Sequence, residues 1–122
     1  MTSLKVLVID DEEVICNACH LVLCEKGHKV DMRGTGKSGL LAVENGDYDL
    51  ILLDMKLPDM DGMEVLKIVG EKKPDPSVIV MTGYSTMSNA VQAMKIGAVD
   101  YLAKPFTDDE LIEAVEEAFN DK

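Results

Sequence analysis

Residues 49–54 read DLILLD, a nearly unbroken apolar run that ends in the carboxylate of Asp54. Such a run is typical of a parallel strand buried on both faces of a sheet. The loop MKLPDMDG follows as residues 55–62, and the next helix is not expected to begin before Asp61 or Gly62. Asp54 is therefore too far from that helix to act as its cap. We predict a central strand over residues 49–53 with Asp54 at its carboxyl end.

Similar segments lie on both sides of this strand. Apolar runs that predict strands cover residues 4–9, 78–81 and 99–102, with a weaker one at 29–32. Helical spacing of apolar residues predicts helices over residues 13–26, 37–45, 63–71, 86–96 and 108–119. Strict alternation of strands and helices predicts an α/β fold, a doubly wound five-stranded parallel sheet with helices on both faces. The 122 residues suit one domain spanning 1–122.

The charge balance restricts the possible partners. The formal net charge is −11 at pH 7, which repels phosphate backbones and anionic lipids. We therefore expect no direct contact of this domain with nucleic acid or membrane. No apolar run approaches the ~18–20 residues that a membrane span needs, and the N-terminus lacks a signal-peptide cleavage site. The cytoplasm is the expected location.

Three cysteines occur close together, at positions 16, 19 and 24. Residues 16–20 (CNACH) match the Cys-x-x-Cys-His pattern of covalent haem attachment, which belongs to exported proteins. The segment also has apolar residues at helical spacing: Val14, Ala18, Leu21 and Val22. This spacing predicts a helix with Cys19 facing the core. We therefore expect reduced thiols and neither haem nor zinc.

Polar residues follow each of the predicted central strands. They are Asp10, Asp11, Glu12 and Glu13 after the first strand, Asp54, then Thr82 and Gly83, and finally Lys104 and Pro105. In an open parallel sheet the carboxyl ends of the strands form the ligand-binding edge. Carboxylates, a hydroxyl and an ammonium group are therefore expected to converge there.

Three carboxylates in one pocket repel each other, by about 4 kcal/mol per pair at ~4 Å with an effective dielectric near 20. Lys104 offsets part of this charge, and a hard divalent cation would offset the rest. An oxygen-only site with room for water suits Mg²⁺. Glu12 and Glu13 are instead interpreted as residues that cap the following helix. A carboxylate beside Mg²⁺, faced by Lys104 and Thr82, is suited to accept a phosphoryl group.

Four motifs then resemble one family. They are residues 8–11 (VIDD), 52–62 (LLDMKLPDMDG), 80–83 (VMTG) and 100–106 (DYLAKPF). In this order and spacing they resemble the CheY-like receiver domain of two-component response regulators over essentially the whole chain. The resemblance implies a flavodoxin-like fold with strand order 2-1-3-4-5. It also implies a signalling domain rather than an enzyme, phosphorylated on Asp54 by the phosphohistidine of a sensor histidine kinase.

The resemblance also implies a role for each site residue. Asp11, Asp54 and the backbone carbonyl of Lys56 would bind Mg²⁺ directly, and Asp10 would act mainly through coordinated water. Thr82 and Lys104 would contact the phosphoryl group.

The switch residues that the resemblance implies are Thr82, Tyr101 and Pro105. Tyr101 would change rotamer, and a cis peptide bond would precede Pro105. The face formed by the fourth helix and fifth strand would then control an output domain or form a homodimer. Val91 and Met94 of this region could either pack on the sheet or contribute to that face.

Residues 83–86 and 103–106 are also similar to receivers of NtrC-like, enhancer-binding transcription activators. A stand-alone receiver and a different output domain both remain alternatives.

Two alternative functions are a nucleotide-binding P-loop protein and an interaction module without phosphoryl chemistry. Gly36, Lys37 and Ser38 imitate part of a nucleotide-binding P-loop, but that motif requires a glycine at the position of Asp31. We interpret residues 34–36 as an ordinary strand-to-helix turn. An interaction module that has lost the phosphoryl chemistry is disfavoured, because all five site side chains are present: Asp10, Asp11, Asp54, Thr82 and Lys104.

Overall fold

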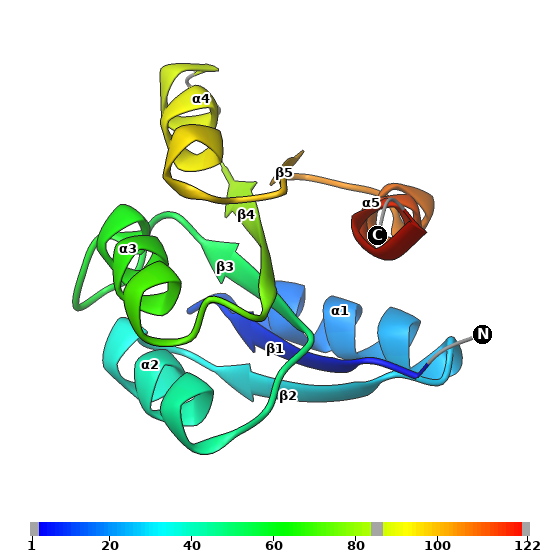
Figure 1. Ribbon diagram of the computed structural model, residues 1–122. Helices are drawn as coiled ribbons and strands as arrows, with labels where there is room; N and C mark the ends of the chain where they lie inside the picture. Colours follow the sequence, from blue (N-terminus) through cyan, green and yellow to red (C-terminus); the bar gives the residue numbers. More distant parts are fainter. Residues whose placement is uncertain (1–2, 84–86, 121–122) are drawn as a thin grey trace.

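The computed structural model describes residues 3–83 and 87–120, which form one five-stranded parallel sheet flanked by helices (Figure 1). The strands are β1 (Lys5–Ile9), β2 (Lys29–Arg33), β3 (Leu50–Asp54), β4 (Ser77–Thr82) and β5 (Asp100–Ala103). The helices are α1 (Glu13–Glu25), α2 (Gly36–Asn45), α3 (Gly62–Lys72), α4 (Met87–Ile96) and α5 (Asp108–Asn120).

The strand order is β2-β1-β3-β4-β5, and every neighbouring pair is parallel. The predicted doubly wound α/β fold is therefore confirmed, and the element boundaries agree to within one or two residues. Residue 86, where the sequence predicted the fourth helix to begin, lies outside the described residues. No helix in the described part of the chain is long and apolar enough to cross a membrane.

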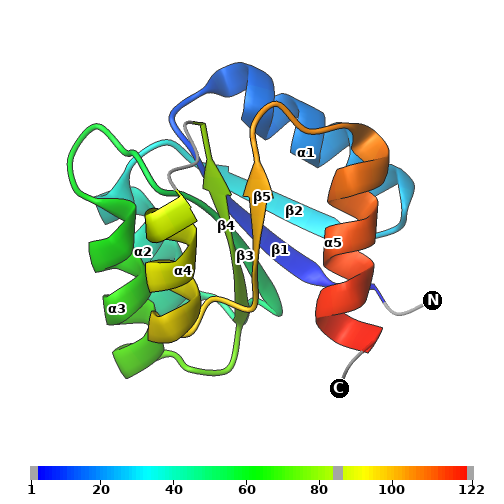
Figure 2. The same cartoon turned by 90° about the horizontal axis from the view of Figure 1, so that it is seen from above.

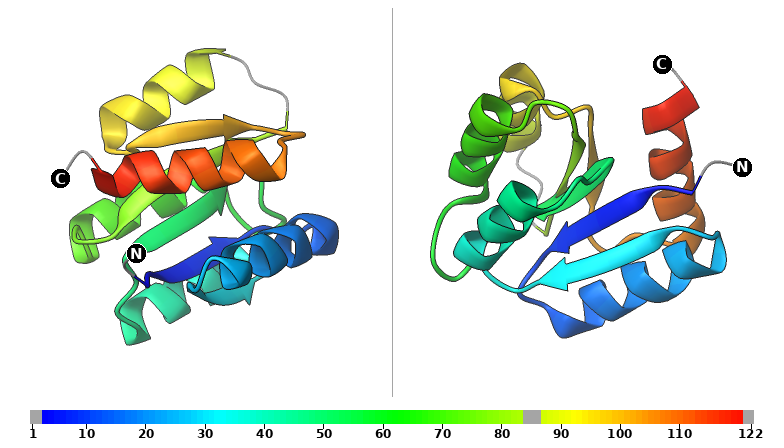
Figure 3. Two further views of the ribbon diagram at one scale, coloured as in Figure 1. Left: turned by 90° about the vertical axis from the view of Figure 1, so that its right-hand side faces the viewer. Right: turned by 60° about the horizontal axis from the view of Figure 1, so that its bottom comes forward.

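Successive residues of each strand face opposite sides of the sheet, so the core has two halves. Val6, Val8 and Leu52 point toward α1 and α5, whereas Leu7, Ile9 and Leu53 point toward α2, α3 and α4. Figures 2 and 3 show the helices arranged in this way on the two faces. The central strand β3 is buried along its whole length, as its apolar sequence predicts.

Three helices begin at side-chain caps. Thr35 accepts a hydrogen bond from the amide of Ser38 at the start of α2, and Asp61 accepts one from Met63 at the start of α3. At the start of α5 the hydroxyl of Thr107 accepts a hydrogen bond from the amide of Glu110. Residues 34–36 form the predicted strand-to-helix turn.

The sequence prediction for α1 was only partly right. Cys19 is fully buried, as predicted, but Val14 and Leu21 are 78% and 64% exposed. The buried face is centred on Cys16, Cys19 and Leu23, because this side of the helix packs against β1 and α5. Val14 and Leu21 project from the other side, so apolar character alone did not identify the inner face.

Helix α4 packs on the sheet through small side chains. Ala90 and Ala93 are buried, whereas Val91 and Met94 are 46% and 42% exposed. Tyr101 of β5 is also exposed, at 37%. Of the two alternatives for Val91 and Met94, the structure favours an exposed apolar face over packing on the sheet.

His28, between α1 and β2, is a buried titratable residue. Its Nδ1 accepts a hydrogen bond of 3.0 Å from the amide of Leu4, so the ring nitrogen must be unprotonated. Burial lowers the pKa of His28, and the carboxylate of Glu116 opposes this effect. Lys26 and Glu116 line the same small cavity as His28.

We predict that the free energy of unfolding decreases as the pH falls through about 6.5, the ordinary pKa of an unfolded histidine. The unfolded chain then binds a proton that the folded chain excludes. The variant His28→Asn keeps a hydrogen-bond acceptor at this position but cannot take up a proton. Its free energy of unfolding, measured with urea at pH 5–7.5, should therefore depend less on pH. His20→Asn, at an exposed histidine, should retain the pH dependence. An unchanged pH dependence in His28→Asn would contradict this account.

Candidate functional site

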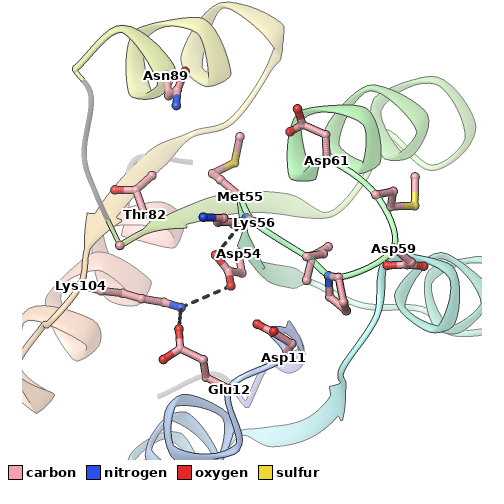
Figure 4. A pocket seen from close by; sticks show the side chains of 14 residues that line it. Asp11, Glu12, Asp54, Met55, Lys56, Asp59, Asp61, Thr82, Asn89 and Lys104 are labelled. Atoms are coloured by element: carbon pink, nitrogen blue, oxygen red, sulfur yellow. Dashed lines mark hydrogen bonds and ion pairs between the residues drawn. The ribbon is translucent and has the colours of Figure 1, made fainter.

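The predicted polar residues meet at the carboxyl edge of the sheet. Asp10 directly follows β1, Asp54 and Thr82 end β3 and β4, and Lys104 directly follows β5. They line or adjoin an open cavity of about 1030 Å³ (Figure 4). Parallel pairing of β1, β3, β4 and β5 brings these residues together from distant parts of the chain.

The ammonium group of Lys104 is the centre of this arrangement. Its Nζ lies 2.7 Å from Asp10 Oδ2, 2.8 Å from Glu12 Oε1 and 3.4 Å from Asp54 Oδ2. The contact with Asp10 is an ion pair that is not aligned as a hydrogen bond, whereas Lys104 donates a hydrogen bond to Glu12. One cation is therefore in contact with three carboxylates.

These charges are largely removed from water. The Lys104, Asp10 and Asp54 side chains are 8%, 0% and 6% exposed, against 58% for Glu12. Burial raises the pKa of Asp54 to about 6, although the amide of Lys56 and the charge of Lys104 counteract it. For Lys104, burial opposes the charged form, but its close contacts with the carboxylates of Asp10 and Glu12 raise its pKa above the ordinary value.

Thr82 carries an unsatisfied polar atom beside this charge cluster. Its buried Oγ1 has no hydrogen-bond partner among the described residues. Leaving a buried hydroxyl unpaired costs free energy. Because Thr82 also lines the cavity with Asp54 and Lys104, its hydroxyl is available to a ligand bound there.

The loop between β3 and α3 is held against the carboxylate of Asp54. The amide of Lys56 donates a 3.2 Å hydrogen bond to Asp54 Oδ1, and the amide of Gly62 donates one of 3.0 Å to the carbonyl of Met55. A Cβ atom on Gly62 would lie 2.5 Å from Met55 Cα and 2.6 Å from the carbonyl oxygen of Asp54. Only glycine therefore allows the loop to return this close to the end of β3.

The interpretation of Glu12 as a side-chain cap is wrong. Glu12 occupies the N-cap position of α1, but its side chain makes no capping hydrogen bond. Its carboxylate extends over the site to Lys104, because both groups lie at the same sheet edge (Figure 4). One oxygen atom from each of Asp10, Asp11, Glu12 and Asp54 lies within 4.8 Å of the others.

Cys16 has a supporting role at the site that its sequence position did not predict. Its thiol donates a hydrogen bond of 3.2 Å to the backbone carbonyl of Asp10. Burial, followed by the charge of Asp10, raises the pKa of Cys16 to about 11. A protonated thiol therefore supports the strand end that presents Asp10, a role that the spacing of the cysteines does not indicate.

Comparison with known proteins assigns the family. The response regulator receiver domain family matches residues 6–116. The chain belongs to this family. The receiver domain from Methanospirillum hungatei JF-1 has the same fold, with a TM-score of 0.93 and 32% sequence identity, and the match covers 98% of this chain and 96% of that one.

Full-length relatives of this receiver domain are regulators of transcription. The transcriptional regulatory protein DltR of Streptococcus agalactiae is 39% identical over 109 residues, which make up 89% of this chain and 49% of DltR. The transcriptional regulatory protein ZraR of Escherichia coli is 35% identical, and the match covers 95% of this chain and 26% of ZraR. The chain thus spans about half or less of these relatives.

Two further predicted features of the receiver domain can be located. The peptide bond between Lys104 and Pro105 is cis, as the resemblance implied. Tyr101 lies on β5, opposite Val80 of β4, with its side chain partly exposed.

The P-loop alternative conflicts with the structure at the start of α2. The amides of Gly36 and Lys37 donate hydrogen bonds to the two carboxylate oxygens of Asp59, at 2.7 and 3.0 Å. These hydrogen bonds lower the pKa of Asp59. A helix N-terminus that would cradle phosphate is therefore already occupied by a carboxylate of the β3–α3 loop.

We predict that Asp54→Asn stabilises the receiver domain by about 1–3 kcal/mol at pH 7 without divalent cations. Burial raises the pKa of Asp54 from 3.8 to about 6, so ionising this group costs folded-state stability as the pH rises through that interval. Urea unfolding of both proteins at pH 4–8 measures the difference, which should shrink toward pH 4. A destabilised Asp54→Asn protein at pH 7 would contradict this prediction.

Proposed function

We propose that this receiver domain accepts a phosphoryl group on Asp54 from the phosphohistidine of a sensor histidine kinase. The observation that supports this most directly is the placement of Asp54 between the Lys104 ammonium, 3.4 Å away, and an open cavity lined by the unpartnered hydroxyl of Thr82. Lys104 and Thr82 can both donate to phosphoryl oxygens. The domain would therefore act as a phosphorylation-dependent switch and not as an enzyme with a separate substrate.

The donor set at this edge fits Mg²⁺. Four carboxylates meet there, and Lys104 supplies the only cation in contact with them among the described residues. Oxygen ligands with space left for water suit this hard ion. We propose that Asp11, Asp54 and the carbonyl of Lys56 would hold it, with Asp10 acting through water. Bound Mg²⁺ would neutralise charge that develops on the transferring phosphoryl group.

The transfer itself needs little from the protein beyond positioning and charge. A carboxylate oxygen of Asp54 forms a bond to phosphorus while the bond between phosphorus and the histidine nitrogen breaks, and the imidazole leaves. Lys104 remains a cation throughout, because the neighbouring carboxylates of Asp10 and Glu12 keep its pKa high. Its ammonium and the Thr82 hydroxyl would then bind the oxygens of the new acyl phosphate.

The output would be read on the face formed by α4 and β5. Large apolar side chains are exposed in this region, namely Val91, Met94, Val99 and Tyr101. Thr82 ends β4 beside Ala103 of β5, which is two residues from Tyr101. Movement of Thr82 toward the phosphoryl group would therefore be followed by rotation of Tyr101 and repacking of this face.

We propose that the repacked face forms a homodimer or controls an output domain that regulates transcription. The names of DltR and ZraR support a role in transcription, and the motif similarity supports an activator of the NtrC-like class. Such a regulator would act in the cytoplasm, which agrees with three unpaired cysteines.

Phosphorylation can be tested with acetyl phosphate, a small phosphoryl donor. With Mg²⁺, the wild-type domain should gain one phosphoryl group by intact-mass analysis, because Asp54 is the acceptor. Asp54→Asn should gain none. Equal adducts, or none in either protein, would exclude Asp54 as the acceptor and favour an interaction module without this chemistry.

The metal requirement is tested in the same assay. Asp11→Ala should remain folded, since removing one of several like charges relieves repulsion, but it should lose phosphorylation that depends on Mg²⁺. Circular dichroism checks the fold. Phosphorylation of this variant at the wild-type rate would contradict the assignment of Asp11 to the metal.

Association through the α4–β5 face should respond to activation. We predict that beryllofluoride with Mg²⁺, a mimic of the bound phosphoryl group, increases the sedimenting mass of the wild-type domain and not that of Tyr101→Ala. Leu41→Ala removes an exposed apolar side chain from α2 and should behave like the wild type. Identical masses in all three proteins would contradict a homodimer on this face.

A further inference from the structure

The three carboxylates around Lys104 differ in their freedom to move. The Asp10 and Asp54 side chains are 0% and 6% exposed and directly follow or end buried strands, so their positions are fixed. The Glu12 side chain is 58% exposed and extends from the first residue before α1. Glu12 is therefore the one partner that can leave Lys104 without disturbing the core.

The ammonium group of Lys104 is already surrounded by carboxylates. Lys104 has three N–H bonds, and three carboxylate oxygens lie within 3.4 Å of its Nζ. Among the described residues, the hydrogen bond that the Lys104 ammonium donates goes to Glu12. A phosphoryl oxygen on Asp54 would compete with this carboxylate for the ammonium group. Asp10 is buried and cannot withdraw, so Glu12 is the partner that can be released.

The position of Glu12 agrees with this role. Its carboxylate lines the same cavity as Asp54, Thr82 and Lys104 and lies beside the approach to Asp54 (Figure 4). Its negative charge would also repel a phosphoryl group that is bound there. Both effects favour the unphosphorylated state of the domain.

From this geometry we propose that Glu12 is an inhibitory positioning residue, which holds Lys104 in the resting state and is displaced when a phosphoryl group binds at Asp54. This inference rests on the function proposed above and adds a regulatory device to the same site. In the bound state Glu12 contributes nothing to Lys104, so its removal destabilises only the resting state. The affinity for a phosphoryl group is therefore set partly by a residue that neither accepts it nor binds it.

The test uses Glu12→Gln, with Glu13→Gln as a matched control. Glu13 is the next residue along the chain, is exposed, and is not among the ion-pair partners of Lys104. Both variants remove one negative charge near the start of α1. At saturating Mg²⁺, which removes differences in metal affinity, beryllofluoride is titrated into each protein.

We expect Glu12→Gln to bind beryllofluoride about two- to fivefold more tightly than the wild type, the range for an exposed ion pair. Glu13→Gln should match the wild type. The NMR signal of the Lys104 side-chain amine should differ between wild type and Glu12→Gln when both are free, and coincide when both are bound. A structural effect on folding would not produce this pattern.

Other outcomes would overturn the proposal. Equal affinities of all proteins, or equal gains in both variants, would mean that Glu12 has no specific role. Weaker binding by Glu12→Gln would mean that Glu12 supports the bound state. Failure of wild type and Glu13→Gln to be phosphorylated by acetyl phosphate would instead refute the proposed function itself.

Discussion

Asp10 and Asp54 are two buried carboxylates at one end of the sheet, and the ammonium group of Lys104 lies between them. Without that cation, two like charges in a medium of low dielectric would each be protonated or exposed to water. The chain places Lys104 there through the pairing of β5 with β4, in which the Lys104 amide donates a 2.8 Å hydrogen bond to the carbonyl of Thr82. The site therefore depends on the last strand of the sheet.

The same interaction leaves the site incompletely neutralised. One cation faces four clustered carboxylates, and burial still raises the pKa of Asp54 to about 6. The remaining negative charge is what a divalent cation would compensate. Burial of this negative charge costs stability locally, a pattern that is common at functional sites.

The structure on the two sides of Asp54 is packed differently. The β3–α3 loop is fixed by the close approach of Gly62 and by the two hydrogen bonds from the start of α2 to Asp59. The α4–β5 side is joined to the sheet mainly through the small residues Ala90 and Ala93, and it exposes Val91 and Met94.

The fold and most of the site could be predicted from the order of residues along the chain. Apolar runs of strand length alternated with helical spacing, and polar residues such as Asp54 and Lys104 directly followed the strands, so topology alone predicted their convergence. The tertiary structure decided the features that depend on side-chain direction. It showed which side of α1 is buried, that Val91 and Met94 are exposed, and that Glu12 binds Lys104 instead of capping α1. These features depend on which residues from distant parts of the chain pack against, or form hydrogen bonds with, each side chain. The spacing of residues along the chain does not contain that information.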